Sequence, residues 1–214
     1  MIVIGLTGSI GMGKSTAAKV LCDEMGIPVH DADTVAHKLM AADGNAVLKI
    51  ASLFPTSLEK NDQGQKYINR KTLGGLVFNN ANALKKLEDI LHPMIRADRR
   101  QFLISMKELG HKMVILDLPL LFETGEDKRV NSVICVSAPA DVQKKRVLAR
   151  PNMTEEKFNL ILNKQLPDKE KRNLSDIVIE TDKGMDDMRQ QLRIAIDAID
   201  KKHTQVRPVP KNGF

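Results

Sequence analysis

Residues 8–16 read GSIGMGKST and follow a short apolar run at Ile2–Ile4. This stretch fits G-x-x-x-x-G-K-[ST], the phosphate-binding loop, with a β-branched strand before it and a helical pattern after it. The glycines let the backbone curl tightly, so that several N–H groups converge on a phosphate at the start of a helix. A Gly-rich loop alone could be an ordinary strand-to-helix turn, but here the strand, Lys14 and Ser15 agree with the same site. The stretch therefore predicts nucleotide binding.

Two side chains of this loop have separate expected tasks. Lys14 can bring a positive charge to the β- and γ-phosphates of a nucleotide. The hydroxyl of Ser15 can fill one Mg²⁺ coordination position. We therefore expect ATP or a related triphosphate, with Mg²⁺, at this loop.

Composition favours one folded protein. The chain has 214 residues, of which 42% are hydrophobic and 28% charged, which is typical of one compact soluble domain. No apolar run approaches the roughly 18 to 20 residues of a membrane-spanning helix, and the first residues lack the features of a signal peptide. We expect a cytoplasmic protein with no membrane partner, a monomer or weak homo-oligomer.

The net charge of +6 could suggest a nucleic-acid partner. However, the basic residues are spread over the chain and aromatic residues make up only 3%, so a stacking platform for bases is missing. We expect no nucleic-acid binding. Cys22 and Cys135 lie far apart without further metal ligands nearby, which favours two buried thiols over a disulfide or zinc site.

The chain after the loop predicts an α/β fold. A helical pattern over Ser15–Met25 ends at Gly26, and a short strand at Ile27–His30 runs into two aspartates. This β-α-β order is the start of a parallel sheet, whose ligands bind at the carboxyl ends of the strands. Asp31 and Asp33 are therefore either a helix N-cap and first-turn acid, or a pair of which one accepts the proton of an attacking hydroxyl while their charge helps to organise Mg²⁺.

The region between about residues 34 and 109 has a different pattern. Helical pieces are expected at Thr34–Met40, Ala46–Phe54 and Ala81–Ile90, with a polar turn at Asn61–Gly64 and no buried strand. A helical insertion of this length is a natural acceptor-binding subdomain. The proline that follows His92 is expected to stop or restart a helix, which then runs over Met94–Leu109. His92 itself is either a capping or packing residue, or a substrate contact.

A second apolar run, Met113–Leu116, predicts a strand buried on both faces. It ends at Asp117, which is either an ordinary acidic strand end or the carboxylate that meets Mg²⁺ or its water shell beside Ser15. Pro119–Glu123 follows and is expected on the acceptor side of the sheet.

The last third continues the sheet and adds a helical hairpin. Strands are expected at Val130–Val136 and Asp176–Ile179, and helices at Met153–Gln165 and Met185–Lys201. Between the first strand and the hairpin tip, Arg146 and Arg150 lie four residues apart on one helical face. This is either a solvated basic face, or a pair in which Arg146 stacks on the adenine and Arg150 closes over the phosphates as part of a mobile lid.

Taken together, these pieces resemble the dephospho-coenzyme A kinase family of P-loop kinases. The resemblance covers nearly the whole chain in the family's order. It rests on GLTGSIGMGKST (5–16), DADTVAH (31–37), LHPMI (91–95), DLPLLFE (117–123), Arg146 with Arg150, NKQLP (163–167) and SDIVIET (175–181).

The resemblance implies transfer of the γ-phosphoryl group of ATP to the ribose 3′-hydroxyl of dephospho-CoA, with Mg²⁺. It implies a three-layer P-loop fold with a nucleotide core at about 1–33, 110–140 and 174–204, a helical CoA-binding insertion at about 34–109, a lid at about 141–173 and a flexible tail at 205–214. The implied ATP-binding residues are Gly11, Met12, Gly13, Lys14, Ser15, Thr16, Arg146 and Arg150, with Asp33 as base. The implied acceptor contacts are Asp31, Asp33, His92, Pro119, Leu120 and Glu123.

The chain departs from the family pattern at two positions. Pro151 stands where many members have an acid, and His37 stands where an arginine is frequent. The nearest alternative is another small-metabolite or nucleoside kinase, which would share the loop and lid but have a different acceptor site. A regulatory GTPase would need Asn-Lys-x-Asp after a late strand, whereas Asn163-Lys164-Gln165 is followed by Leu166.

Overall fold

A computed structural model describes residues 1–78, 80–151 and 153–205. The chain divides into two compact units, one formed by Met1–His30 and Met106–Phe214 and the other by Asp31–Ser105. Each unit has its own hydrophobic cluster. They are described separately below.

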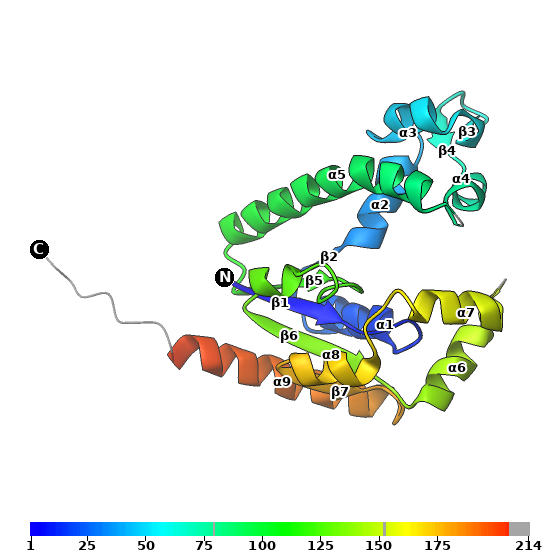
Figure 1. The fold of residues 1–214 in the computed structure, drawn as a ribbon. Coiled ribbons are helices and arrows are strands. Elements are labelled where there is room, and N and C mark those ends of the chain that lie inside the picture. The colour runs from blue at the N-terminus through cyan, green and yellow to red at the C-terminus, as the bar shows by residue number, and fades with distance from the viewer. Residues whose placement is uncertain (79, 152, 206–214) are drawn as a thin grey trace, which may run out of the picture. The chain divides into compact units, whose positions relative to one another are not determined.

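The first unit is built on a five-stranded sheet in the order β2-β5-β1-β6-β7 (Figure 1). The strands are β1 (Ile2–Thr7), β2 (Val29–Asp31), β5 (Met113–Asp117), β6 (Ser132–Ser137) and β7 (Ile177–Glu180). The pairs β1–β5, β1–β6 and β6–β7 are parallel. Every residue of β6 is buried, as expected of a strand with a covered face on each side.

Alternation along β6 shows that both faces of this sheet are covered. Ile134 and Val136 belong to the cluster that includes Leu192 and Ile199 of α9 (Met185–Gln205). Cys135 lies between them in the strand. Its thiol is close enough to Asp168, Lys171 and Arg172 of α8 (Asp168–Leu174) for their charges to shift its pKa. Because successive side chains of a strand point to opposite faces, α9 and α8 cover different faces. The prediction of a three-layer α/β fold is confirmed.

The remaining helices of this unit are α1 (Lys14–Lys19), the π-helix η1 (Val20–Glu24), the 3₁₀-helix η3 (Glu126–Arg129), α6 (Ala140–Leu148) and α7 (Glu155–Leu162). They include those predicted after the loop and in the hairpin, whereas η3 and α8 were not predicted. The α1–η1 helix ends before Gly26, whose φ is 67°. Helices α6 and α7 pack on each other as a hairpin, and Lys144 pairs with Glu155 across it.

The second unit contains α2 (Ala32–Met40), α3 (Val47–Leu53), the 3₁₀-helix η2 (Pro55–Ser57), α4 (Arg70–Val77) and most of α5 (Ala81–Glu108). Its cluster includes residue pairs three or four apart on three of these helices: Val47 and Ile50, Leu73 and Val77, and Leu87 and Leu91. Such a spacing turns one apolar stripe of α3, α4 and α5 toward the cluster.

This unit also holds an antiparallel hairpin of β3 (Leu58–Lys60) and β4 (Lys66–Ile68). The polar turn between these strands was expected, but the strands and α4 were not, and Ile68 is buried. The sequence thus missed two short strands, but neither is a buried strand, because Ile68 is their only buried residue. Three-residue strands are too short to show a clear alternation of polar and apolar residues.

Helix α5 corrects a second prediction. It runs without interruption through Pro93, where a stop or restart was expected. Proline removes the hydrogen bond to the carbonyl four residues earlier. Both Pro93 and Asp89 are exposed, so water can satisfy that carbonyl, while Leu87 and Leu91 keep the opposite stripe packed.

Three further outcomes concern the chain at large. Cys22 is exposed, so the prediction of two buried thiols holds only for Cys135. Helix α9 extends to Gln205, four residues beyond the expected end, and residues 206–214 of the predicted tail lie outside the described residues. Within the described ranges, the helices include none that is long and apolar enough to cross a membrane.

Candidate active site

The predicted phosphate-binding loop joins β1 to α1. Gly13 caps α1 with a left-handed backbone (φ 92°), which only glycine adopts readily. Its carbonyl accepts hydrogen bonds from the N–H groups of Thr16 and Ala17, each at 3.0 Å. A Cβ atom at residue 13 would lie 3.1 Å from the hydroxyl of Thr181. The loop conformation therefore depends on glycine at this position.

The same loop lies tightly against β6. A Cβ atom at Gly8 would lie 2.5 Å from a methyl carbon of Val136 and 2.6 Å from its carbonyl oxygen. Real Cβ atoms do not approach a backbone oxygen so closely. The loop can lie this near to β6 only because Gly8 has no side chain.

Three distant polar side chains hold the loop backbone. The Gln143 side-chain amide donates to the carbonyl of Ile10 at 2.7 Å, and the Gln165 side-chain oxygen accepts from the Ile10 N–H at 3.0 Å. The Thr181 hydroxyl donates to the carbonyl of Met12 at 2.8 Å. None of these three side chains was predicted from the sequence to have a role at the site. Gln165 and Thr181 do lie in the stretches 163–167 and 175–181 that carry the family resemblance. Together the three side chains orient the loop from α6, from the end of the hairpin and from the end of β7.

Lys14 and Asp117 form an ion pair. Their side chains are 14% and 5% exposed, so both charges are largely removed from water, and each is offset by the other. The structure thus brings together the two charged groups that were predicted beside the nucleotide and its metal. Ser15, the next residue of the loop, is exposed.

A cavity of about 290 Å³ opens beside the loop. Arg146 lies in its wall and donates to the Thr181 hydroxyl at 2.9 Å and to the Thr181 carbonyl at 2.7 Å. Arg150 is exposed. The lining is completed by loop glycines and by apolar residues of α9: Gly11, Gly13, Thr16, Arg146, Arg150, Thr181, Gly184, Met185 and Met188. A wall with two guanidinium groups and apolar side chains suits a ligand with a flat aromatic ring, because guanidinium groups stack on such rings.

The segment Pro119–Glu123 after β5 is fixed by a buried lysine. Lys171 of α8 is fully buried and its ammonium group lies 2.9 Å from Oε1 of Glu123 and 2.7 Å from the carbonyl of Pro119. The same Glu123 oxygen accepts from the Leu166 N–H at 2.7 Å. Glu123 therefore has a structural partner, and its predicted acceptor contact stays a prediction. Leu120 is 38% exposed.

The two aspartates predicted near the acceptor differ in role. Asp31 is the N-cap of α2, where its carboxylate accepts from the N–H groups of Asp33 (2.9 Å) and Thr34 (3.2 Å) and from the Thr34 hydroxyl (2.7 Å). The capping alternative is thus correct for Asp31. Asp33 is exposed in the first turn of α2, and in the part of the chain that the structure describes its carboxylate has no hydrogen-bond or ion-pair partner. His92 is exposed on α5, and its substrate role stays a prediction.

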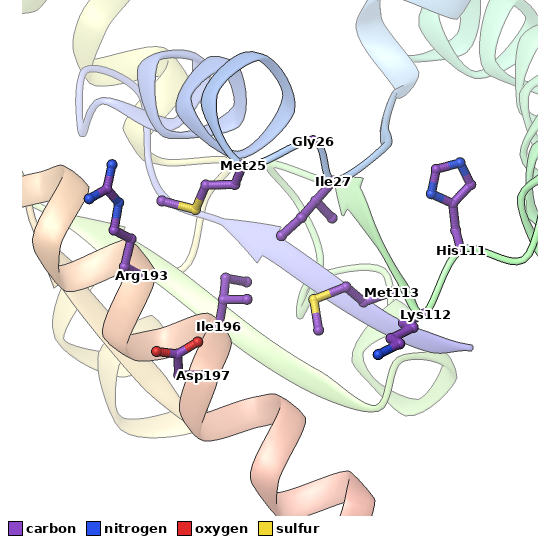
Figure 2. A pocket seen from close by; sticks show the side chains of 9 residues that line it. All are labelled: Met25, Gly26, Ile27, His111, Lys112, Met113, Arg193, Ile196 and Asp197. Atoms are coloured by element: carbon purple, nitrogen blue, oxygen red, sulfur yellow. The ribbon is translucent and has the colours of Figure 1, made fainter.

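A second cavity lies at the amino ends of the strands, away from the phosphate-binding loop at their carboxyl ends. Figure 2 shows its wall, formed by Met25 to Ile27, by His111 to Met113 at the start of β5, and by Arg193, Ile196 and Asp197 of α9. Its volume is about 450 Å³. Ligands of parallel sheets bind at the carboxyl ends of the strands, so this cavity is separate from the nucleotide site.

Among the described residues, no cluster of three or more His, Cys, Asp or Glu side chains is placed to hold an ion. The predicted Mg²⁺ ligands Ser15 and Asp117 stay a prediction.

A glycine-dependent loop between the central strand of a parallel sheet and a helix defines the class of P-loop nucleotide-binding proteins. A family model described as dephospho-CoA kinase matches residues 2–187. The chain belongs to the dephospho-CoA kinase family.

Relatives and solved structures agree with this assignment. A dephospho-CoA kinase of Mesorhizobium japonicum is 47% identical over 199 residues, covering 93% of this chain and 97% of the relative. One from Rhodopseudomonas palustris is 46% identical and covers 94% and 97%. The solved dephospho-CoA kinase of Campylobacter jejuni is 30% identical with a TM-score of 0.67, covering 94% of this chain and 98% of that chain. A solved Thermus thermophilus protein is 32% identical with a TM-score of 0.76, covering 92% and 96%.

Proposed function

We propose that this chain transfers the γ-phosphoryl group of ATP to the ribose 3′-hydroxyl of dephospho-CoA, which gives CoA, in the cytoplasm. The observation that carries the proposal is the family match over residues 2–187, which includes the complete phosphate-binding loop. Helix-start N–H groups, a lysine and a hydroxyl at that loop supply what a bound triphosphate requires.

The nucleotide contacts follow from the loop and the neighbouring cavity. The backbone of Gly11–Thr16 would hold the phosphates, and Lys14 would exchange its contact with Asp117 for one with the β- and γ-phosphates. The adenine would lie in the 290 Å³ cavity, against Arg146 and the apolar side chain of Met188. Arg150 would neutralise phosphate charge, which spreads over the equatorial oxygens during transfer.

Mg²⁺ would be held by the hydroxyl of Ser15 and the carboxylate of Asp117, directly or through water, together with the ATP phosphates. When bound, the ion supplies charge neutralisation between the β- and γ-phosphates. Release of Lys14 by the arriving phosphates would make Oδ1 of Asp117, which Lys14 contacts, available for this task.

Asp33 is proposed as the general base. The oxygen of the 3′-hydroxyl attacks the γ-phosphorus, its proton passes to a carboxylate oxygen of Asp33, and the bond from the γ-phosphorus to the β–γ bridging oxygen breaks to release ADP. Asp31 would act through Asp33, because its cap fixes the first turn of α2. His92, Pro119, Leu120 and Glu123 are proposed acceptor contacts.

The deciding experiment measures ADP release by the purified chain with dephospho-CoA, with adenosine and with no acceptor. We expect release only with dephospho-CoA, and phosphate on the 3′-oxygen of the product. Equal release without acceptor would reject kinase specificity, and release with adenosine alone would favour a nucleoside kinase.

A further inference from the structure

Thr181 follows β7 directly and joins two parts of the nucleotide site. The residue is 6% exposed. Its hydroxyl donates to the Met12 carbonyl of the phosphate-binding loop at 2.8 Å and accepts from Nη1 of Arg146 at 2.9 Å. Its carbonyl accepts from Nη2 of Arg146 at 2.7 Å. A residue for which the sequence predicted no role thus connects the loop to the arginine in the wall of the 290 Å³ cavity.

The chemistry of the three groups fixes the direction of both hydroxyl bonds. A guanidinium group can only donate and a backbone carbonyl can only accept, whereas a hydroxyl does both. The single proton of the Thr181 hydroxyl therefore points to Met12, and a lone pair of its oxygen faces Arg146. Linked hydrogen bonds polarise each other, so the charged donor on one side strengthens donation on the other. The link depends on the hydroxyl, because an apolar side chain can make neither bond.

The two bonds from Arg146 to Thr181 hold the guanidinium group by its edge. Guanidinium N–H groups lie in the plane of the group, so both faces stay free to stack on an aromatic ring. Two acceptors on one residue also fix the orientation of that plane, which a single bond would leave free to rotate. In the ranges that the structure describes, Arg146 has no carboxylate partner. A neutral residue thus orients this cation, and its charge stays available to a bound nucleotide.

The methyl group of Thr181 lies close to Gly13. A Cβ atom at Gly13 would lie 3.1 Å from the Thr181 hydroxyl oxygen and 3.2 Å from its methyl carbon, so both groups lie beside the backbone of the loop. Valine has nearly the same shape without the hydroxyl, and serine keeps the hydroxyl without the methyl group. The two substitutions therefore separate hydrogen bonding from packing.

We propose that Thr181 is a positioning residue that sets Arg146 relative to the phosphate-binding loop, so that one nucleotide can contact both. The loop holds the phosphates, Arg146 contacts the adenine, and the Thr181 hydroxyl fixes one against the other before the nucleotide binds. Without that hydroxyl, Arg146 has to be ordered on binding, which costs affinity. The inference rests on the proposed function, because it takes the adenine contact of Arg146 from there.

The test measures binding of ATP and of inorganic triphosphate by titration calorimetry without acceptor, for the wild type, Thr181→Val and Thr181→Ser. Triphosphate fills the loop but has no base to contact Arg146. The readout is the ratio of the two affinities, because a general loosening of the loop weakens both ligands equally. Thr181→Val should lower the affinity for ATP relative to that for triphosphate by about 3- to 10-fold, the cost of ordering one long side chain on binding. Thr181→Ser should keep the wild-type ratio, and Thr181→Ala, a second variant without the hydroxyl, should match Thr181→Val.

A double-mutant cycle with Arg146→Met tests whether Thr181 acts through Arg146. Methionine keeps an unbranched chain but has no charge and no donor for Thr181. In that background, Thr181→Val should leave the ratio of the ATP and triphosphate affinities unchanged. Thermal unfolding followed by circular dichroism checks that the compared variants are folded.

The outcomes separate the inference from the proposed function. The inference is wrong if Thr181→Val leaves the ratio unchanged, if Thr181→Ser lowers it as much as Thr181→Val, or if Thr181→Val still shifts it in the Arg146→Met background. In each of these cases, phosphorylation of dephospho-CoA by the wild type would leave the proposed function standing. A wild type that binds ATP no more tightly than triphosphate would instead contradict the adenine contact on which both depend.

Discussion

Replacing Lys171 with methionine should destabilise the protein far more than removal of any exposed lysine. The Lys171 side chain is fully buried and its ammonium group contacts Glu123 and the carbonyl of Pro119. Methionine has a similar length and no charge, so it leaves little cavity behind. The substitution therefore removes the cation and leaves a carboxylate that is only 16% exposed.

Removing one partner of a buried ion pair typically costs about 3 to 5 kcal/mol, because the other charge stays behind without compensation. The unpaired carbonyl of Pro119 is part of that cost rather than an addition to it. For a protein of this size, 1 kcal/mol shifts the melting temperature by about 2 to 4 °C. Lys171→Met should thus lower the melting temperature by roughly 6 to 20 °C.

Urea unfolding measures the free energy of unfolding and thermal unfolding the melting temperature, both followed by circular dichroism. Lys144→Met is the matched control, since the Lys144–Glu155 pair has side chains 48% and 61% exposed, and such pairs contribute at most about 1 kcal/mol. The double variant Lys171→Met/Glu123→Gln removes both charges and should recover part of the loss. If Lys171→Met lies within about 1 kcal/mol of the wild type, the buried pair does not stabilise the fold as argued.

Three other predictions concern the catalytic groups and the thiols. Asp33→Asn should lower kcat by more than about 10²-fold with ATP affinity nearly intact, and near-normal turnover in a coupled ADP assay would remove Asp33 from the base role. Lys14→Ala should lower kcat by about 10²-fold or more through lost charge stabilisation, and an unimpaired variant would contradict that assignment. At pH 8 a disulfide reagent should label only the exposed Cys22 of the folded chain, at a rate that rises with pH as the thiolate forms; partial desolvation and then Asp23 raise the pKa of this thiol, which shifts that rise to higher pH. Burial raises the pKa of Cys135 to about 11, so this thiol should react only after unfolding, and the folded Cys22→Ser variant should stay unlabelled.

The parts of the fold that sequence reasoning predicted well carry local signals. Strands β1, β5 and β6 are apolar runs that end at recognisable residues, such as Asp117 at the end of β5. The phosphate-binding loop combines fixed spacing with glycines that the backbone requires, as the left-handed φ of Gly13 shows. Each of these signals is contained within about ten residues, so no knowledge of the tertiary structure is needed to read it.

The features that were missed depend on contacts between distant segments. Gln143 and Gln165 both bind the backbone of Ile10, across 133 and 155 residues of sequence. Lys171 lies in a strongly charged stretch that is typical of a solvated helix, and the positions of Glu123 and of the Pro119 carbonyl explain its burial. Glutamine and lysine occur on most helix surfaces, so their residue types gave no indication of these roles.

The contacts of the α6–α7 hairpin limit how it can act as a lid. Gln143 in the first half of α6 and Gln165 beyond α7 both hold Ile10, so both bases of the hairpin are tied to the phosphate-binding loop. Arg146 is fixed by its two bonds to Thr181, and its guanidinium is thus oriented before a nucleotide arrives, which lowers the ordering cost of binding. Arg150 lies beyond the end of α6, exposed, and its side chain has no hydrogen bond or ion pair to any residue that the structure describes. If Arg150 has its proposed role over the phosphates, the part of the hairpin that would have to move is the segment around Arg150, because the base and Arg146 are tied to the loop.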